Sequence, residues 1–417
     1  MAEQTGVTTC CVVGGGPAGM MLGLLLSRAG VHVTVLEKHA DFFRDFRGDT
    51  IHPSTIELID ELGFADELEA VPHQVVSRLR ADVNGRWLTV ADLSVLRRRH
   101  RNIYMMPQWD FLALIERKAA ENPTFALEMR AEVTDLWTED GRVVGVVYRQ
   151  DGETKRLRAA LTVACDGRGS ILRARREARP VDFGAPMDVL WFSIPRYATD
   201  PDETFGTIRP GHMLVLIDRG RYWQAGLLIP KGDHSTVRER GLDAFRAKLV
   251  ELAPFLGDGR LASIKSFDDV HVLLVQVNQL ARWFYPGLLF LGDAAHAMSP
   301  IGGVGINLAI QDAVAAANIL ARPLRAGRVR SIDLARVQLR RALPAAITQA
   351  IQVAAQRRVI RRVLDGRVLR PPAWLVRLLS SRTIRGLTAR ALAVGLRPEH
   401  WRSPARSASW PHAHAAR

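Results

Sequence analysis

Lysine is scarce in this chain. Only six of its 57 basic residues are lysines, so the formal net charge of +14 comes almost entirely from arginine. The charge is also uneven, because residues 357–417 hold 14 arginines against Asp365 and Glu399, whereas residues 1–356 carry a net charge of +2. A nearly neutral body does not favour a nucleic-acid partner, and we expect none.

Cysteine and long apolar runs are also missing. The three cysteines, Cys10, Cys11 and Cys165, cannot build a disulfide framework, which favours a reducing compartment and a cytoplasmic location. No apolar run approaches the roughly 20 residues that a membrane-spanning helix needs. With 417 residues, 47% of them hydrophobic, the chain can bury a large core, and we expect two interlocked domains and a terminal appendage.

A nucleotide-binding unit opens the chain. The β-rich residues 8–13 lead into a glycine-rich turn and an apolar helix, and residues 31–37 alternate as a second strand that ends at Glu37. In such a unit the glycines let backbone N–H groups approach a pyrophosphate, and the helix N-terminus attracts the phosphates. Glu37 is placed to accept hydrogen bonds from a ribose diol. The predicted dinucleotide contacts are Gly14, Gly16, Pro17, Ala18, Gly19, Glu37 and Lys38.

Two later motifs indicate which dinucleotide is bound. Asp166 and Gly167 follow a predicted strand at 161–164, and residues 292–307 read Gly-Asp-Ala-Ala-His-Ala-Met-Ser-Pro-Ile-Gly-Gly-Val-Gly-Ile-Asn. With the first unit, these motifs resemble those of class A flavoprotein monooxygenases of the para-hydroxybenzoate hydroxylase-like family over residues 8–320. The resemblance implies bound FAD and an α/β fold. In that fold a Rossmann-like FAD-binding domain interlocks with a mixed β-sheet substrate domain and C-terminal helices.

The resemblance also implies roles for residues of these motifs. Asp293 corresponds to the aspartate that hydrogen-bonds the ribityl or ribose hydroxyls of FAD, and Pro300 corresponds to the proline beside the flavin where oxygen reacts. The glycines that follow lead a helix whose free backbone N–H groups face the negative charge of reduced flavin. The implied catalytic positions are Pro300, Gly302 and Gly303; the implied cofactor contacts are Asp166, Gly167, Gly292, Asp293, Gly305, Ile306 and Asn307.

Other positions are assigned together with their alternatives. By resemblance, Arg47 contacts the cofactors and Gln108 contacts FAD, although a solvated surface role is also compatible with an arginine at position 47. His296 is more typical of a structural histidine beside the flavin than of an acid–base group, and His52 stays unassigned. Val304 stands where the hydroxybenzoate enzyme has a lysine, which disfavours an acidic substrate.

The residues between the two later motifs are expected to form a sheet that covers the flavin and lines the substrate pocket. Predicted strands at 213–217 and 222–229 are joined by a hairpin turn at 218–221. The predicted pocket residues are Trp191, Met213, Tyr222, Trp223 and Gln224, although strand alternation implies that about half of them pack the sheet core instead. No acid or arginine anchor is evident on these strands, which favours a neutral and fairly large substrate.

The motifs also suggest domain boundaries. The FAD-binding domain takes residues 1–70, 101–180 and 281–330, the substrate domain takes 71–100 and 181–280, and an arginine-rich helical region takes 331–417. We expect long helices beyond Asn307, interrupted by Pro344 and by Pro371-Pro372. Basic and apolar residues are interleaved over 357–417, which allows either packing on the FAD domain or a weak contact with anionic membrane lipid.

The predicted function is an FAD-dependent monooxygenase. It would use NAD(P)H and O2 to hydroxylate or epoxidise a hydrophobic, aromatic or polyketide-like molecule through a flavin C4a-hydroperoxide. Only one complete dinucleotide fingerprint is present, so NADPH or NADH is expected to bind transiently. No metal site is predicted. The alternatives are a reductase of the geranylgeranyl-reductase type, a halogenase and a non-catalytic flavoprotein. None of the nine tryptophans lies two positions from another, which argues against the Trp-x-Trp motif of a halogenase.

Overall fold

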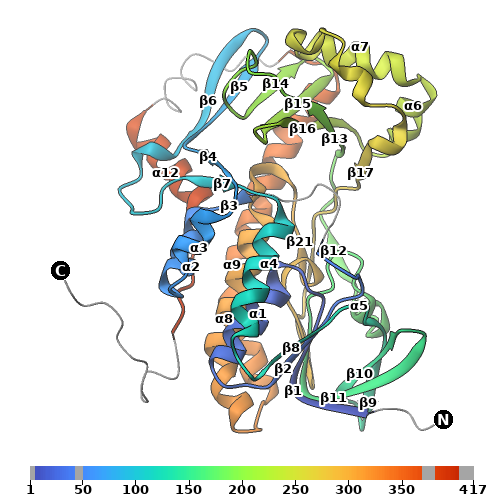
Figure 1. The fold of residues 1–417 in the computed structure, drawn as a ribbon, viewed down its shortest axis with the longest axis vertical. Helices are drawn as coiled ribbons and strands as arrows, with labels where there is room; N and C mark the ends of the chain where they lie inside the picture. Colours follow the sequence, from blue (N-terminus) through green and yellow to red (C-terminus); the bar gives the residue numbers. More distant parts are fainter. Residues whose placement is uncertain (1–4, 43–49, 369–380, 403–417) are drawn as a thin grey trace.

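The computed structural model describes residues 5–42, 50–368 and 381–402, and two large sheets organise this part of the chain (Figure 1). The first sheet contains the predicted nucleotide-binding unit. Its strand order is β19-β20-β11-β1-β2-β8, and β10 and β9 extend it beside β11. The strands are β1 (Thr5–Val13), β2 (Val33–Leu36), β8 (Phe125–Glu128), β9 (Glu132–Glu139), β10 (Arg142–Gln150), β11 (Glu153–Ala164), β19 (Phe284–Tyr285) and β20 (Leu288–Phe290).

The central strands of this sheet are parallel, because helices carry the chain back across one face. β1 pairs in parallel with both β2 and β11. The helix α1 (Pro17–Arg28) follows β1 and is buried continuously from Ala18 to Ser27. It packs against α4 (Gln108–Ala120) and α8 (Gly305–Arg325), and aliphatic side chains of the three helices share one core with the sheet. The predicted β-α-β unit is therefore present, with its turn at the carboxyl end of β1.

The second sheet lies at the opposite end of the molecule (Figure 1). Its order is β17-β13-β16-β15-β14-β5-β6. The strands are β5 (Arg78–Val83), β6 (Arg86–Asp92), β13 (Met187–Pro195), β14 (Phe205–Arg209), β15 (His212–Asp218), β16 (Tyr222–Pro230) and β17 (His271–Leu273). The predicted hairpin is confirmed, with Gly220 at a φ of +76° in the turn between β15 and β16. One face of this sheet packs against α7 (Leu242–Leu252), and the other faces the first domain.

Smaller elements connect the two sheets. Two sheets of three strands have the orders β3-β7-β4 and β12-β18-β21. Their strands are β3 (Thr50–Ile51), β4 (Gln74–Val76), β7 (Ile103–Met105), β12 (Pro180–Asp182), β18 (Asn278–Leu280) and β21 (His296–Ala297). The short helices are α2 (Pro53–Glu61), α3 (Ala65–Ala70), α5 (Ile171–Arg175) and α6 (His234–Glu239). The 3-10 turns are η1 (Leu93–Val95), η2 (Pro254–Leu256), η3 (Arg260–Ser263), η4 (Phe267–Asp269), η5 (Gly292–Ala294) and η6 (Ile301–Gly303).

The C-terminal helices contradict one prediction. We expected Pro344 to interrupt the helix, but α9 (Ser331–Ala355) runs straight through it. Proline removes one backbone hydrogen bond and costs about 3 kcal/mol or more in a helix interior. Here Pro344 is buried and α9 packs along α8, so tertiary packing outweighs that cost. The chain continues as the π-helical η7 (Gln356–Ile360), α10 (Arg361–Leu364) and α12 (Arg382–Ala393), while Pro371-Pro372 lies outside the described residues.

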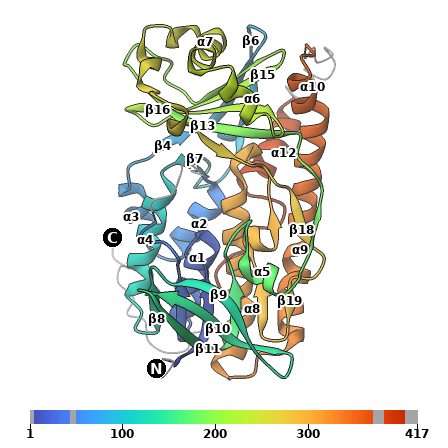
Figure 2. The same ribbon diagram turned by 90° about the vertical axis from the view of Figure 1, so that its right-hand side faces the viewer.

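One described segment, Ile301–Arg325, is long and apolar enough to cross a membrane. However, 78% of its apolar window is buried inside the protein. It contains α8, which packs between α1 and α9, and Figure 2 shows α9 outside it along the edge of the molecule. This segment therefore has the packing of a core helix.

Candidate functional site

The turn between β1 and α1 can accept an anionic ligand. Gly14 has a φ of +104°, and a Cβ there would lie 2.5 Å from the carbonyl oxygen of Cys165. Gly16, by contrast, has no atom within 4 Å of the position that a Cβ would take, so its surroundings are open. Among the residues that the structure describes, no side chain caps the start of α1, and no acid lies in its first turn. Its backbone N–H groups are thus available to a pyrophosphate, as the motif predicts.

Glu37 lies at the end of β2, next to this turn. It is 4% exposed, and its carboxylate accepts hydrogen bonds from the backbone N–H groups of Gly15 at 2.7 Å and His39 at 3.0 Å. These bonds hold the carboxylate against the glycine turn, in the position expected for a ribose-binding acid. Lys38 is exposed beside it, and a cofactor contact by its side chain remains a prediction.

Asp166 follows β11 on the neighbouring strand of the same sheet. Burial raises the pKa of its carboxyl, against hydrogen bonds from Ser170 and from the backbone of Leu172. Its Oδ1 atom is buried and has no hydrogen-bond partner among the described residues. A partly desolvated acid beside a glycine turn is typical of a functional site.

The two later motifs are in direct contact. Arg168 forms an ion pair with Asp293 at 2.9 Å, although 125 positions separate them, and Arg173 donates to the carbonyl of Ala294 at 3.3 Å. Both Arg168 and Asp293 are partly exposed, so solvent reaches the pair. Gly292 lies behind the pair with a φ of +58°, and a Cβ there would approach Ala18 and Ala309 at 3.3 and 3.2 Å. The structure thus brings Asp166, Gly167, Gly292 and Asp293 together near the β1–α1 turn.

The loop that precedes α8 is held in one conformation by its neighbours. Gly302 and Gly303 have φ values of +79° and +62°, which L side chains rarely adopt. Thr50 donates to the carbonyl of Gly303 at 2.7 Å. On the other side, Gln352 of α9 donates to the carbonyls of Ser299 and Ile301, and Gln356 donates to the hydroxyl of Ser299. Pro300 lies inside this fixed loop, and the start of α8 has no side-chain cap, so its N–H groups can face a ligand.

The side chain of Asn307 joins the segment 50–55 to the loop before α8, a role that the sequence did not predict. Its side-chain oxygen accepts hydrogen bonds from the backbone N–H of His52 at 2.9 Å and the hydroxyl of Thr55 at 2.8 Å. Its NH2 group donates to the carbonyls of Thr50 at 3.1 Å and Gly303 at 3.4 Å. With the side chain engaged on all sides, the predicted cofactor contact of Asn307 would have to use its backbone, as would those of Gly305 and Ile306.

His296 has the structural environment that we favoured over an acid–base role. It is 1% exposed, and its Nε2 lies 2.6 Å from Asp312, which also pairs with Arg341 at 2.9 Å. Burial would raise the pKa of Asp312, but the charges and hydrogen bonds of His296 and Arg341 hold it below its ordinary value. Asp312 also accepts from the backbone N–H of Gly292 at 3.3 Å. This buried cluster therefore supports the 292–297 turn from behind.

The remaining predicted FAD contacts have different outcomes. Gln108 is the first residue of α4 and is half-buried, and its contact with FAD remains a prediction. Arg47 lies outside the described residues. His52, which had no assignment, is 1% exposed and its Nδ1 donates to the carbonyl of Leu392 at 2.7 Å. Burial lowers the pKa of His52 to about 4, so its ring is neutral at ordinary pH.

Trp191 and Met213 lie on the face of the second sheet that points toward the first domain. Both side chains pack against a buried apolar cluster that includes Val189 and Leu228, and Val215 and Ile301 of the loop before α8 pack against the same cluster. The indole of Trp191 lies over Gly226, where a Cβ would approach ring atom Cζ3 at 2.9 Å. Its Nε1 is buried and has no hydrogen-bond partner among the described residues. This face therefore offers an apolar wall, and the Trp191 N–H is a buried donor without a partner among the described residues.

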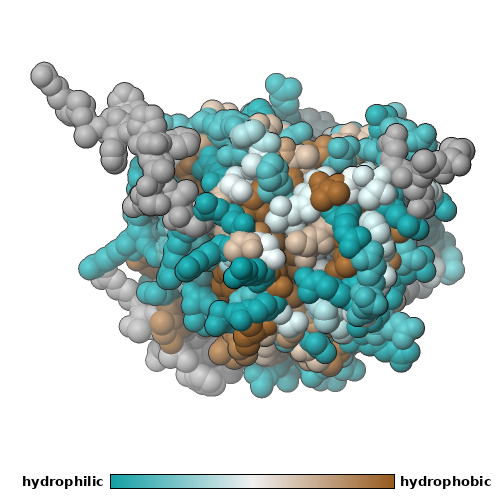
Figure 3. Space-filling view, turned by 90° about the horizontal axis from the view of Figure 1, so that it is seen from below, coloured by the Kyte–Doolittle hydropathy of each residue, from teal (hydrophilic) through white to brown (hydrophobic). Residues whose placement is uncertain are grey.

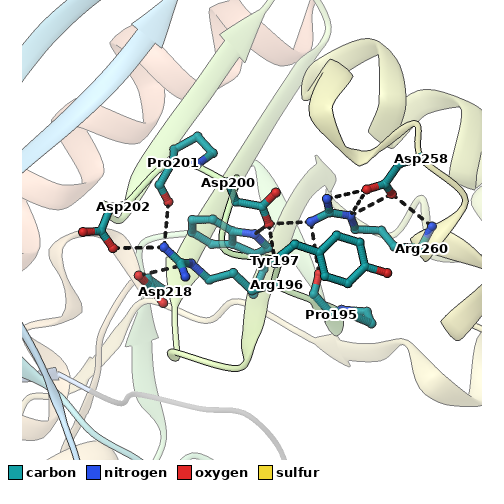
Figure 4. A network of polar contacts seen from close by, with 10 residues as sticks. Pro195, Arg196, Tyr197, Asp200, Pro201, Asp202, Asp218, Asp258 and Arg260 are labelled. Carbon is teal, nitrogen blue, oxygen red and sulfur yellow. Dashed lines mark hydrogen bonds and ion pairs between the residues drawn. The ribbon is translucent and has the colours of Figure 1, made fainter.

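The prediction for Trp223 is wrong. Alternation along β16 turns its side chain to the opposite face, where it is fully buried against Phe205 and Phe255. Its Nε1 donates to Asp200 at 2.9 Å, inside a polar network that includes Arg260 (Figure 4). Tyr222 and Gln224 share the face of Trp191, and Arg219 donates to the Gln224 side-chain oxygen at 2.9 and 2.6 Å. Pocket roles for these two residues remain predictions.

The helix α12 is a part of the site that sequence reasoning missed. Leu392 lies so close to Gly302 that a Cβ on the glycine would approach its Cδ1 at 3.1 Å, and it packs against the same buried apolar cluster as Trp191 and Val215. No local motif marks Leu392. Three glutamines, Gln349 and Gln352 of α9 and Gln356 of η7, were also missed, although their spacing places them on one helix face and could have indicated a polar contact.

These features together fit FAD. The open space at Gly16, the uncapped start of α1 and the carboxylate of Glu37 suit a pyrophosphate and a ribose. A separate cleft of about 250 Å³ lies between α2, α3 and the residues before β7, and it is lined by Ile56, Ala65, Asp66, Glu69, Arg99, His100, Arg101, Asn102 and Tyr104. None of the predicted site residues lines that cleft.

Comparisons with known proteins agree with this geometry. Residues 7–351 match the family described as FAD binding domain. A 6-methylpretetramide 4-monooxygenase from Streptomyces rimosus is 32% identical over 373 residues, which cover 88% of each chain. Among solved structures, a p-nitrophenol 4-monooxygenase from Pseudomonas putida superposes with a TM-score of 0.75 at 19% identity, over 93% of this chain and 97% of that one. A flavin-dependent brominase superposes with a TM-score of 0.74 at 18% identity, over 96% of each chain, so the fold alone does not separate the two chemistries.

Proposed function

The chain belongs to the class A FAD-dependent monooxygenase family, and we propose that its substrate is an uncharged, planar aromatic or polyketide-like molecule of several rings. The protein is an FAD-dependent monooxygenase that consumes NAD(P)H and O2. The observation that supports the substrate class is the apolar wall of Trp191, Met213 and Val215 opposite the loop before α8. The relative that acts on 6-methylpretetramide, at 32% identity, points to the same class.

Different residues of this chain would bind FAD and stabilise its flavin ring. Bound FAD supplies the electron transfer and the oxygen chemistry. The β1–α1 turn and Glu37 would hold the adenosine half of FAD, and Asp166 and Asp293 would line the groove for the rest. The free N–H groups at the start of α8 would stabilise negative charge on the flavin, while Pro300, Gly302 and Gly303 keep bulky side chains away from it.

Substrate orientation in this proposal depends on the sheet and on α12. Trp191, Met213 and Leu392 would enclose the aromatic rings and exclude water, and the unpaired Nε1 of Trp191 would donate to a substrate oxygen. The positions of β13, β15 and β16 that share this face hold no acid and no arginine, which supports an uncharged ligand. NADPH or NADH would bind transiently. In the cytoplasm, a weak contact of the C-terminal region with anionic membrane would bring the enzyme near substrates that partition into lipid.

The test is a substrate screen with purified holoenzyme. NAD(P)H oxidation is followed while planar phenols with one to several rings are added, with benzoate-type acids as the charged comparison set. We expect multi-ring neutral phenols to accelerate NAD(P)H oxidation and O2 uptake together. Acceleration by the acids alone would contradict the proposed substrate class, whereas NAD(P)H oxidation without O2 uptake would indicate a reductase.

A further inference from the structure

The outer face of α9 carries large apolar side chains that remain uncovered in the described part of the chain. Leu339 is 76% exposed, Leu343 63%, Ile351 57%, Ile332 51% and Ile347 39%. We call these five residues the α9 stripe. Their spacing places them on one side of the helix over about 29 Å, while the other side packs on α8. Contiguous exposed apolar surface of this kind marks an interaction site.

Figure 2 shows α9 along the outer edge of the molecule, where an approaching partner can reach it. The hydropathy surface in Figure 3, seen from below, shows hydrophobic patches among hydrophilic residues. The stripe has no role in the site described above, because the residues that hold the loop before α8, Gln352 of α9 and Gln356 of η7, are buried. Its exposure is therefore not explained by the oxygenation chemistry.

Arginines surround the stripe. Residues 322–367 contain twelve arginines and only two acids, Asp333 and Asp365. Asp333 is buried beside Arg336, so Asp365 is the exposed acid of the segment. Exposed arginines lie before the stripe at 322, 325, 328 and 330, and after it at 357, 358, 361 and 362. The natural partner of this face is both apolar and anionic.

A second copy of this chain does not match that description. Because arginines lie at both ends of the stripe, a parallel or an antiparallel pair of α9 helices would bring like charges together. Such contacts are unfavourable at an interface. An anionic bilayer, in contrast, offers an apolar interior below a layer of phosphate groups, which suits a helix face with apolar residues and flanking arginines.

We propose that the α9 stripe docks on the surface of anionic phospholipid bilayers. Leu339, Leu343 and Ile351 enter the boundary between headgroups and acyl chains, and the arginines at both ends contact the phosphates. This places the contact on α9 and not on α12, which packs against β6 and η1. The proposal does not depend on the identity of the substrate.

The test uses full-length holoenzyme and co-sedimentation with vesicles of phosphatidylglycerol and phosphatidylcholine, or of phosphatidylcholine alone, at low and high salt. We expect binding to the anionic vesicles that high salt weakens. The double variant Leu339→Ser/Leu343→Ser should lower the partition coefficient at least tenfold, and Arg357→Gln/Arg358→Gln should lower it about 25-fold, since each basic residue contributes about fivefold. The matched control is Leu387→Ser, a leucine of α12 that is 59% exposed.

Three results would overturn the proposal. They are equal binding to neutral and anionic vesicles, equal binding by the wild type and the stripe variant, or a loss caused by Leu387→Ser as large as that of the stripe variant. Sedimentation equilibrium without lipid tests whether the stripe instead binds a second copy of this chain. A dimer in the wild type that is absent in Leu339→Ser/Leu343→Ser would assign the stripe to self-association. If that double variant does not retain FAD, Leu343→Ser alone and the arginine variant decide the outcome.

Discussion

The FAD-binding half and the second sheet are built from different kinds of contact. Around the cofactor groove, backbone geometry dominates: glycine turns at Gly14 and Gly303 and the uncapped starts of α1 and α8. In the second sheet, side chains far apart in sequence form the critical contacts, such as Arg260 with Asp200 and Lys231 with Asp188. The glycine turns that face the cofactor are therefore encoded locally, whereas their support from Thr50 and Arg341 and the packing of the second sheet depend on how distant segments meet.

Asp312→Ala should have the largest effect, because it breaks the buried charge cluster that supports the FAD half from behind. Removing Asp312 leaves His296 buried without its carboxylate and leaves Arg341 with Glu399 as its remaining carboxylate, which we expect to cost about 3–5 kcal/mol. Urea unfolding with and without FAD measures it. Asp365→Ala, at an exposed aspartate, is the control and should change little. A loss below about 1 kcal/mol would mean that the cluster does not support the fold.

The pH dependence of the free energy of unfolding should show the titration of His52, which lies at the contact between the FAD half and α12. Burial holds its pKa at about 4 in the folded state against 6.5 when unfolded. Its contribution is complete above pH 6.5 and is lost as the pH falls toward 4, because the unfolded chain then binds a proton that the folded chain does not. The loss over this range is about 3 kcal/mol. His52→Gln should flatten that part of the profile in urea unfolding, and an unchanged slope would place the titration elsewhere.

Two glycines of the same turn separate folding from cofactor binding. Gly14→Ala forces a left-handed residue and a close approach to the Cys165 carbonyl, so we expect about 1–3 kcal/mol of destabilisation. Gly16→Ala meets no protein atom and should leave stability unchanged while it weakens FAD binding, because its methyl group faces the space assigned to the pyrophosphate. Unfolding and FAD titration of both variants give the answer. Full FAD affinity in Gly16→Ala would contradict the placement of the cofactor.

Gly226→Ala should have the smallest effect, and it should change substrate binding alone. An added Cβ would approach the Trp191 ring at 2.9 Å and move it, and the loss of an aromatic contact of about 1 kcal/mol corresponds to a roughly fivefold rise in KM. FAD affinity should not change. Gly206→Ala on β14, where the nearest atom is 3.7 Å away, is the matched control. An equal rise in both variants would remove Trp191 from the proposed pocket.

The same contrast explains what the sequence predicted. The β-α-β unit and the hairpin at 218–221 follow from local patterns of glycine, strand and turn, whereas the shared cofactor site of the Asp166 and Gly292 motifs was implied by the family resemblance. Trp223 was misplaced because alternation says that half of a strand faces each side but not which half. Pro344 was read as a helix break because propensity does not include the packing of α9 on α8. Leu392 carries no signal, since its role comes from the distant contact between α12 and Gly302.

The most direct test of the central claim is isotope labelling of the product. Holoenzyme is supplied with NAD(P)H, an aromatic substrate from the screen and 18O2, and the product is analysed by mass spectrometry. A monooxygenase of this family must place one 18O atom from the gas into each product molecule and must stop under argon. Product formed at full yield under argon, or product without 18O, would contradict the account.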